Sequence, residues 1–353
     1  MKAKFYVGSK SGDAKAGLRV FDIDSESGEI RQLSQVDEAV DPVYLATSVD
    51  GKFLYVAEKV TPKDGADVGG IAVYSIEGTK LTKVADYSCA PTVPCHIALS
   101  HDGKFLVFAE YSHATAGVFA IRPDGLLDGP VAKIQHEGSG PNPVRQEAAH
   151  CHCSVTTPDD SCICICDLGL DKVFVYKADL QKGTMTEVQD AGFTSAPGAG
   201  PRHIIFHPTV NFAFLVTELD NTVVSLRHLG GGVLEPVGTY AMLPDNVTGD
   251  SKAAAIKISP DGHWVLASNR GYDSISVFKF DLKSGKLERV AINKLNGAFP
   301  RDFTFTPDGK FIVLGHKLSD EVAVYTFDSL TGKMHQVANT LKMIKPLCFV
   351  FAK

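Results

Sequence analysis

A short phrase recurs along this chain: a Ser or Thr, one residue, Asp-Gly, usually a Lys, and then an alternating apolar run. Clear copies begin at Ser48, Ser100, Ser259 and Thr306, and two degenerate copies lie between them. Counted at the Asp position, the six copies fall at residues 50, 102, 159, 209, 261 and 308, so the intervals are 52, 57, 50, 52 and 47. Asp-Gly favours tight turns, and each copy therefore predicts a hairpin between two strands.

A four-stranded unit that repeats about every 50 residues is typical of a β-propeller blade. The chain begins with the pattern of a second and a third strand, at residues 5–8 and 18–23, and it ends with a first strand at residues 346–350. We therefore predict an all-β fold, a seven-bladed β-propeller formed by a single domain over residues 1–353. The N- and C-terminal strands would share one blade and close the ring, whereas a solenoid would leave two open ends.

Composition excludes several classes of partner. The net charge is −6 without a basic stripe, so we expect no nucleic-acid partner. No apolar run approaches the roughly 20 residues that a membrane span needs, and no signal peptide is recognisable at the start. The eight cysteines do not follow a disulfide framework, and we expect a reducing compartment, the cytoplasm.

Positions at which the copies differ from one another are candidates for function. Seven residues before the Asp position, at the start of each first strand, stand Val43, Cys95, His152, Arg202, Ala254, Arg301 and, in the last copy, Leu347. Nine residues after it, at the end of each second strand, stand Lys59, Tyr111, Leu168, Glu218, Arg270 and Lys317. Because the two strands are antiparallel, both positions lie at one end of the blade. We expect the Arg, Glu and His residues of these sets to converge at one mouth of the central channel.

This set of residue types suits acid–base chemistry on a small anion. Arginine binds carboxylate or phosphate in a bidentate manner, and Glu and His commonly transfer protons. The alternative is a purely structural ion pair between Arg202 and Glu218 at the rim of the channel.

The chain resembles the seven-bladed propeller lactonases of the 6-phosphogluconolactonase type, which are related to fungal 3-carboxymuconate cyclase. The motifs are Gly-Ala-Gly-Pro-Arg-His at 198–203, Thr-Glu-Leu at 217–219, Asn-Pro-Val-Arg-Gln-Glu at 142–147, His-Cys-His at 150–152 and Pro-Arg at 300–301. The resemblance implies that His152, Arg202, Glu218 and Arg270 are catalytic. We expect Arg301, Arg145, Gln146 and His150 to bind substrate. Register alone selects His152 over His150.

The resulting hypothesis is a lactonase that hydrolyses a sugar lactone, 6-phosphogluconolactone, to 6-phosphogluconate, as a monomer and without a metal or another cofactor. Glu218 or His152 would deprotonate water, and Arg202 or Arg270 would stabilise the oxyanion. A lactonizing enzyme of the carboxymuconate cyclase type, acting on a carboxylate, and a non-enzymatic propeller that binds a partner remain as alternatives.

Three further features concern the cysteines, His203 and one long segment. Cys151, Cys153, Cys162, Cys164 and Cys166 have Cys-x-Cys spacing on strands, which favours buried thiols over a zinc site. Strand alternation predicts that His203 faces away from Arg202, into the stack of blades. The long segment 128–149 before His152 is a candidate lid.

Overall fold

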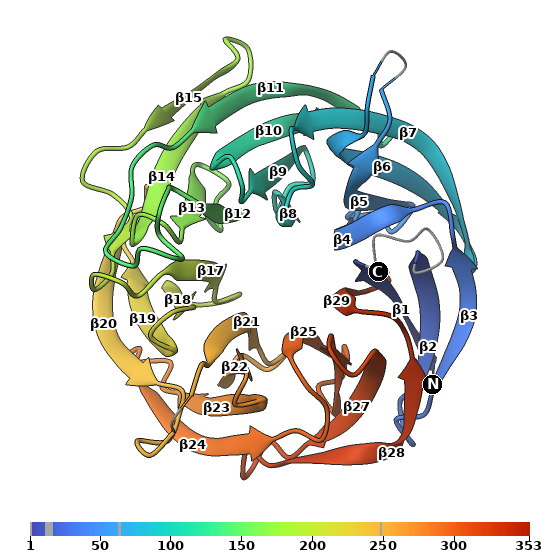
Figure 1. The fold of residues 1–353 in the computed structure, drawn as a ribbon, viewed down its shortest axis with the longest axis vertical. Helices are drawn as coiled ribbons and strands as arrows, with labels where there is room; N and C mark the ends of the chain where they lie inside the picture. The colour runs from blue at the N-terminus through green and yellow to red at the C-terminus, as the bar shows by residue number, and fades with distance from the viewer. Residues whose placement is uncertain (1, 11–16, 63–64, 248) are drawn as a thin grey trace.

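Seven antiparallel sheets surround a central channel, six with four strands and one with an additional short strand, and each has its first strand at the channel and its fourth at the rim (Figure 1). The computed structural model describes residues 2–10, 17–62, 65–247 and 249–353. The predicted seven-bladed β-propeller is confirmed. Within the described ranges, no helix could cross a lipid bilayer.

Each blade runs from the channel outward. The first three are β4 (Val40–Thr47), β5 (Phe53–Val60), β6 (Val68–Glu77) and β7 (Lys80–Ala90); β8 (His96–Leu99), β9 (Phe105–Glu110), β10 (Thr115–Ile121) and β11 (Leu127–Gln135); and β12 (Cys151–Thr156), β13 (Ile163–Asp167), β14 (Lys172–Asp179) and β15 (Thr184–Glu187), with β16 (Phe193–Thr194) also pairing with β14. The fourth and fifth are β17 (Pro201–Phe206), β18 (Phe212–Thr217), β19 (Thr222–His228) and β20 (Leu234–Ala241); and β21 (Lys252–Ile258), β22 (Trp264–Arg270), β23 (Ser274–Phe280) and β24 (Leu287–Lys294). The sixth is β25 (Pro300–Phe305), β26 (Phe311–His316), β27 (Glu321–Phe327) and β28 (Met334–Lys342), and the seventh is β29 (Pro346–Phe351), β1 (Lys2–Ser9), β2 (Leu18–Asp24) and β3 (Ile30–Val36).

The recurring Asp-Gly phrase forms the turn between the first and second strands. The glycines of the four clear copies, at residues 51, 103, 262 and 309, have φ between 70° and 76°, a region that favours glycine. Asp160 takes the same place in a degenerate copy, with φ of 55°. The hydroxyl of Ser48 accepts a hydrogen bond from the Phe53 N–H at 2.9 Å, and Ser or Thr repeats this contact in four other copies. The turn chemistry thus sets the hairpin register in blade after blade.

The core lies mainly between neighbouring blades. One cluster joins Trp264 and Leu266 of the fifth blade to Phe303 and Leu314 of the sixth. Another contains four of the predicted buried thiols, Cys153, Cys162, Cys164 and Cys166, packed against blade four. Because each blade buries apolar side chains on both of its neighbours, the ring needs all seven blades to bury its faces.

The termini close the ring, as the sequence predicts. Strand β29 pairs with β1, with Val7 opposite Phe349 and Phe5 opposite Phe351. Leu347, Cys348 and Phe349 are at most 5% exposed. The last strand of the chain therefore covers what would otherwise be an open edge of β1.

We propose that the ring unfolds as one domain, and deletion of residues 346–353 tests this. Burial of Leu347 and Phe349 contributes about 1.5–3 kcal/mol each, so the truncated protein should melt roughly 10 °C lower. Thermal unfolding followed by circular dichroism measures the change. Removal of Lys353 alone is the control, and equal melting of the long truncation and the full chain would contradict the closure.

Candidate active site

The inner strands begin with irregular pairing at the mouth of the channel. In blade three Cys151 pairs with Asp167 and Cys153 with Cys166, so His152 is an extra residue between two paired positions. In blades four and six the register shift brackets Arg202 and Arg301 in the same way. A bulge bends the strand and re-aims the extra side chain. Three of the sequence-predicted site residues thus occupy bulges.

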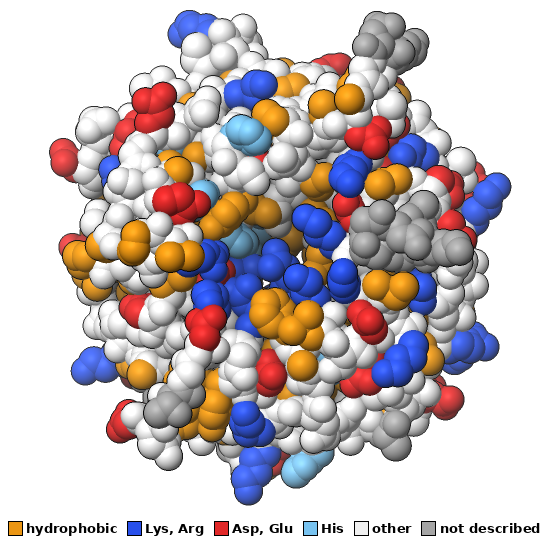
Figure 2. Space-filling model, viewed as in Figure 1, with side chains coloured by type: hydrophobic (Ala, Val, Ile, Leu, Met, Phe, Trp, Pro, Cys, Tyr) orange, Lys and Arg blue, Asp and Glu red, His pale blue; other side chains and the backbone are white. Residues whose placement is uncertain are grey.

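A cavity of about 550 Å³ opens at this mouth. Six Lys or Arg residues but only three Asp or Glu residues line it, and Figure 2 shows Lys and Arg gathered around the central hollow. The volume suits a small-molecule ligand, and the excess of positive charge favours an anion. The lining residues used below are Lys10, Asp41, Lys59, Cys95, Tyr111, Arg145, His152, Glu218, Arg270, Arg301 and Lys317.

Glu218 is the centre of an ion cluster beneath the cavity. Its Oε2 lies 3.0 Å from Arg202 Nε and 2.7 Å from Arg270 Nη2, and its Oε1 lies 2.7 Å from Arg145 Nη1. The three arginines come from the fourth blade, the fifth blade and the loop before the third, so one carboxylate joins distant parts of the chain. The pairing of Arg202 with Glu218 that the register predicts is present.

The arginines control the protonation of Glu218. Its side chain is only 1% exposed. Burial alone would raise the pKa of Glu218, but the charges of Arg270 and Arg202 outweigh burial and hold this pKa well below its ordinary value of 4.5. Glu218 is therefore a firmly ionised carboxylate and a weak base.

His152 faces the same cavity in a different electrostatic state. Burial, reinforced by the charge of Arg202, holds the pKa of His152 well below its ordinary value of 6.5. The imidazole is consequently neutral at neutral pH and has a free lone pair. Its ring contacts the Tyr111 ring edge-on at 5.6 Å, and Cys95 Sγ lies 4.0 Å from Nδ1. His152 is the histidine that lines the cavity.

Arg270 and Arg202 differ in what they offer to a ligand. Arg270 lines the cavity and uses Nε and Nη2 for the carbonyls of Lys252 and Ala253 and for Glu218. Its Nη1 has no partner among the described residues. Arg202 is 2% exposed and is not part of the lining. Its guanidinium contacts Glu218, the Ala254 carbonyl at 2.5 Å and His203. Arg202 therefore holds Glu218 rather than reaching into the cavity.

The structure corrects the expectation for His203. Its Nε2 lies 3.2 Å from Arg202 Nη1, and its ring packs edge-on against those of His96 and His152. His203 thus lies beside Arg202 in the channel, not within the stack of blades. Simple alternation fails because the bulge at Arg202 interrupts the regular reversal of side chains along β17.

Of the predicted substrate-binding residues in the loop before β12, one lines the cavity and two do not. Arg145 lines the cavity and donates from Nη2 to Tyr111 Oη at 3.2 Å. Gln146 is fully buried, and its amide donates to the Leu168 carbonyl and to Asp171. His150 stacks on Tyr111 at 4.2 Å. Gln146 and His150 do not line the cavity, because the Gln146 amide contacts Leu168 and Asp171 and His150 Nδ1 contacts the Tyr111 carbonyl.

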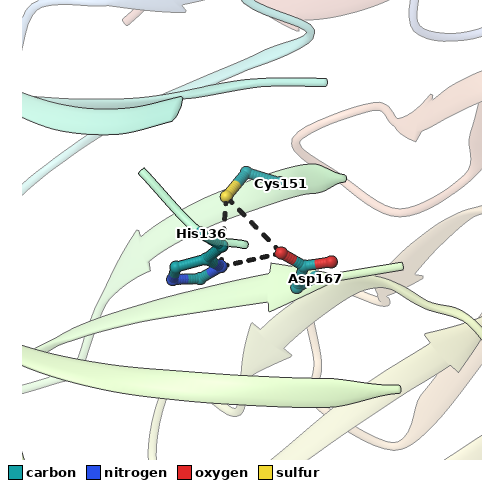
Figure 3. Close-up of side chains that lie close together, drawn as sticks. All are labelled: His136, Cys151 and Asp167. Carbon is teal, nitrogen blue, oxygen red and sulfur yellow. Dashed lines mark hydrogen bonds and ion pairs between the residues drawn. The ribbon is translucent and has the colours of Figure 1, made fainter. Parts of the chain in front are cut away.

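Figure 3 shows a buried group that joins His136, Cys151 and Asp167. One potential ligand atom of each lies within 4.8 Å of the others. Both ring nitrogens of His136 already have partners, because Nδ1 lies 2.7 Å from Asp167 Oδ2 and Nε2 lies 2.9 Å from Tyr176 Oη. The group ties the loop to β13 and fixes the residue directly before His152.

Several cavity residues were not singled out from the sequence. Lys59, Tyr111 and Lys317 stand at the register position that selected Glu218, but the sequence analysis selected only Arg, Glu and His residues there. Lys10 follows β1, which has no Asp-Gly phrase to set its phase. If every residue nine positions after the Asp had been considered, Lys59, Tyr111 and Lys317 would have been found, but not Lys10.

Comparisons with known proteins agree with this geometry. The family described as "Lactonase, 7-bladed beta-propeller" matches residues 4–351. The chain belongs to this lactonase family. It is 35% identical over 303 residues to the 6-phosphogluconolactonase of Bacillus subtilis, covering 85% of this chain and 84% of that one. A 6-phosphogluconolactonase of Formosa agariphila is 30% identical and covers 81% of each chain.

A solved structure shows the same fold. The periplasmic gluconolactonase of Pseudomonas aeruginosa superposes with a TM-score of 0.92 at 28% identity, covering 100% of this chain and 99% of that one. Together with family membership, this identifies the chain as a hydrolase that acts on lactones. A non-enzymatic propeller is thereby set aside.

Removal of the charge on Glu218 should destabilise the protein. Glu218→Gln keeps the shape but leaves three arginines without their carboxylate, and breaking a buried ion pair costs about 3–5 kcal/mol. Urea unfolding measures the loss. The control is Glu321→Gln, whose partner Lys342 is 78% exposed at 3.5 Å and which should cost about 0–1 kcal/mol. Equal stability of the two variants would contradict the cluster's role.

The same variant should alter the dependence of stability on pH. Since the pKa of Glu218 is lower in the folded state than its unfolded value of about 4.3, the unfolded state binds more protons, and the stabilisation is lost as pH falls. Below about pH 4 the difference in unfolding free energy between wild type and Glu218→Gln should narrow by about 1.4 kcal/mol per pH unit. If the difference in unfolding free energy between wild type and Glu218→Gln stays constant from pH 7 to pH 3, the pKa of Glu218 is the same in the folded and unfolded states.

Proposed function

We propose that this lactonase hydrolyses 6-phosphogluconolactone to 6-phosphogluconate, a step of the pentose phosphate pathway. The observation that carries the proposal is the cavity itself, in which a neutral imidazole and an excess of Arg and Lys face the same space. The names of the Bacillus subtilis and Formosa agariphila relatives support the same substrate.

His152 is the general base in this proposal. Its lone pair takes a proton from water as the water oxygen attacks the lactone carbonyl carbon. The tetrahedral intermediate carries a negative charge on the former carbonyl oxygen, and Arg270 Nη1 is the donor available for it. The ring C–O bond then breaks, and the protonated His152 returns the proton to the departing alkoxide.

Glu218 has a positioning role. Its low pKa makes it a poor proton acceptor, whereas its three ion pairs hold the guanidiniums of Arg145, Arg202 and Arg270 in place. An anionic substrate adds negative charge to the cavity and so raises the pKa of His152 from its depressed value, which strengthens the base when substrate is bound. No step is assigned to a metal or another cofactor, because these side chains supply both the proton transfer and the charge stabilisation.

We also propose that the protein acts in the cytoplasm as a monomer. All eight cysteines are free thiols, including Cys153 and Cys166, which lie directly opposite each other on β12 and β13. A reducing compartment keeps such a pair reduced.

Replacement of the base should abolish most turnover. His152→Asn removes the proton acceptor from the cavity, and we expect kcat for 6-phosphogluconolactone to fall about 10²- to 10⁴-fold with little change in KM. Initial rates above the uncatalysed background measure the effect. His335→Asn, at an exposed position of β28, is the matched control. Wild-type kcat in His152→Asn would transfer the role of base to another group.

A further inference from the structure

A second group of cations lines the cavity apart from the Glu218 cluster. It consists of Arg301, Lys317 and Lys10. Among the described residues, none of the three side chains makes a hydrogen bond or an ion pair, whereas Lys59 on the same wall lies 3.1 Å from Asp41. Within the described part of the chain, these three positive charges therefore have no paired carboxylate.

The contrast with the first group is informative. Arg145, Arg202 and Arg270 share the carboxylate of Glu218 and several backbone carbonyls. Arg301, by comparison, occupies a bulge at the start of β25, and its five N–H donors have no partner among the residues that the structure describes. A partly buried guanidinium without an acceptor is costly unless a ligand provides one.

The cations of the second group also repel one another. Burial and the nearby charges of Arg301, Arg270 and Lys10 lower the pKa of Lys317. Burial, followed by the charge of Arg202, likewise lowers the pKa of Arg301. An anion bound among these groups would relieve this repulsion, and a dianion would relieve more of it than a monoanion.

The ring of Phe299 lies near one cation of each group. It lies 5.2 Å from Lys317 Nζ and 5.3 Å from the guanidinium carbon of Arg270. Phe299 has a φ of 64°, which is unfavourable for a bulky side chain. Its N–H donates to Asp273 at 2.8 Å, and its carbonyl accepts from the Lys317 N–H at 3.1 Å. The strained backbone is thus held where the ring contacts one cation of each group.

We propose that Arg301, Lys317 and Lys10 form a phosphate subsite, which binds the phosphoryl group of the substrate and makes the enzyme select phosphorylated over unphosphorylated lactones. The proposal rests on the lactonase function assigned above. Arginine provides a planar fork for two phosphate oxygens, and each lysine adds a point charge. A sugar hydroxyl at this place would leave the charges unbalanced, whereas a phosphoryl dianion balances them best. The reacting end of the lactone would then lie toward His152 and Arg270.

The test compares two substrates that differ only in the phosphoryl group. We measure kcat/KM for 6-phosphogluconolactone and for gluconolactone with wild type, Lys317→Gln, Lys10→Gln and the double variant. The ratio of the two values should fall about 10- to 100-fold in the double variant, since hydrogen bonds to charged groups are the strong ones. The loss should be in KM for the phosphorylated lactone. Lys342→Gln, at a 78% exposed side chain outside the cavity, is the control and should leave both values unchanged.

Inhibition by inorganic phosphate provides a second, independent test of the subsite. It should inhibit wild type competitively, and the inhibition constant should rise by a similar factor in the double variant. An unchanged ratio together with unchanged inhibition would overturn the subsite. If wild type hydrolyses neither lactone, the proposed function fails; if it hydrolyses both with equal kcat/KM, only the subsite fails.

Discussion

The ion cluster around Glu218 is the interaction on which the site depends. One buried carboxylate balances three guanidiniums that come from Arg145, Arg202 and Arg270. Without it, these cations would repel one another in a poorly hydrated space. With it, the fourth and fifth blades and the loop before the third present a fixed wall to the cavity, and an excess of positive charge remains for an anion. Stability and binding therefore share the same residues.

The fold and much of the site could be predicted from the sequence because the repeat provides its own reference frame. The Asp-Gly turn recurs with the same hydrogen bonds, so residues at equal distances from it occupy equivalent places. This placed His152, Glu218, Arg270 and Arg301 at one mouth of the channel, and the structure brings all four there. The closing strand was equally predictable, since only a first strand was missing from the terminal blade.

What could not be predicted depends on irregular backbone and on electrostatics. The bulge at Arg202 turns His203 toward the channel, and nothing in a two-residue periodicity signals it. Gln146 occurs in a motif next to Arg145, yet only the path of the loop shows that it binds Leu168 and Asp171 instead of facing the cavity. The proposal of His152 rather than Glu218 as base depends on the burial of His152 and on the arginines around Glu218, which are properties of the folded chain.

We propose that one cavity holds the reacting end of an anionic lactone at His152 and Arg270 and its charged end at Arg301 and Lys317. The most direct measurement is a crystal structure of the protein with 6-phosphogluconate, the proposed product. We expect the product carboxylate to lie within hydrogen-bond distance of His152 and Arg270, with the phosphoryl group on Arg301 and Lys317. A carboxylate bound away from His152, or a phosphoryl group on the Glu218 arginines, would contradict the proposal.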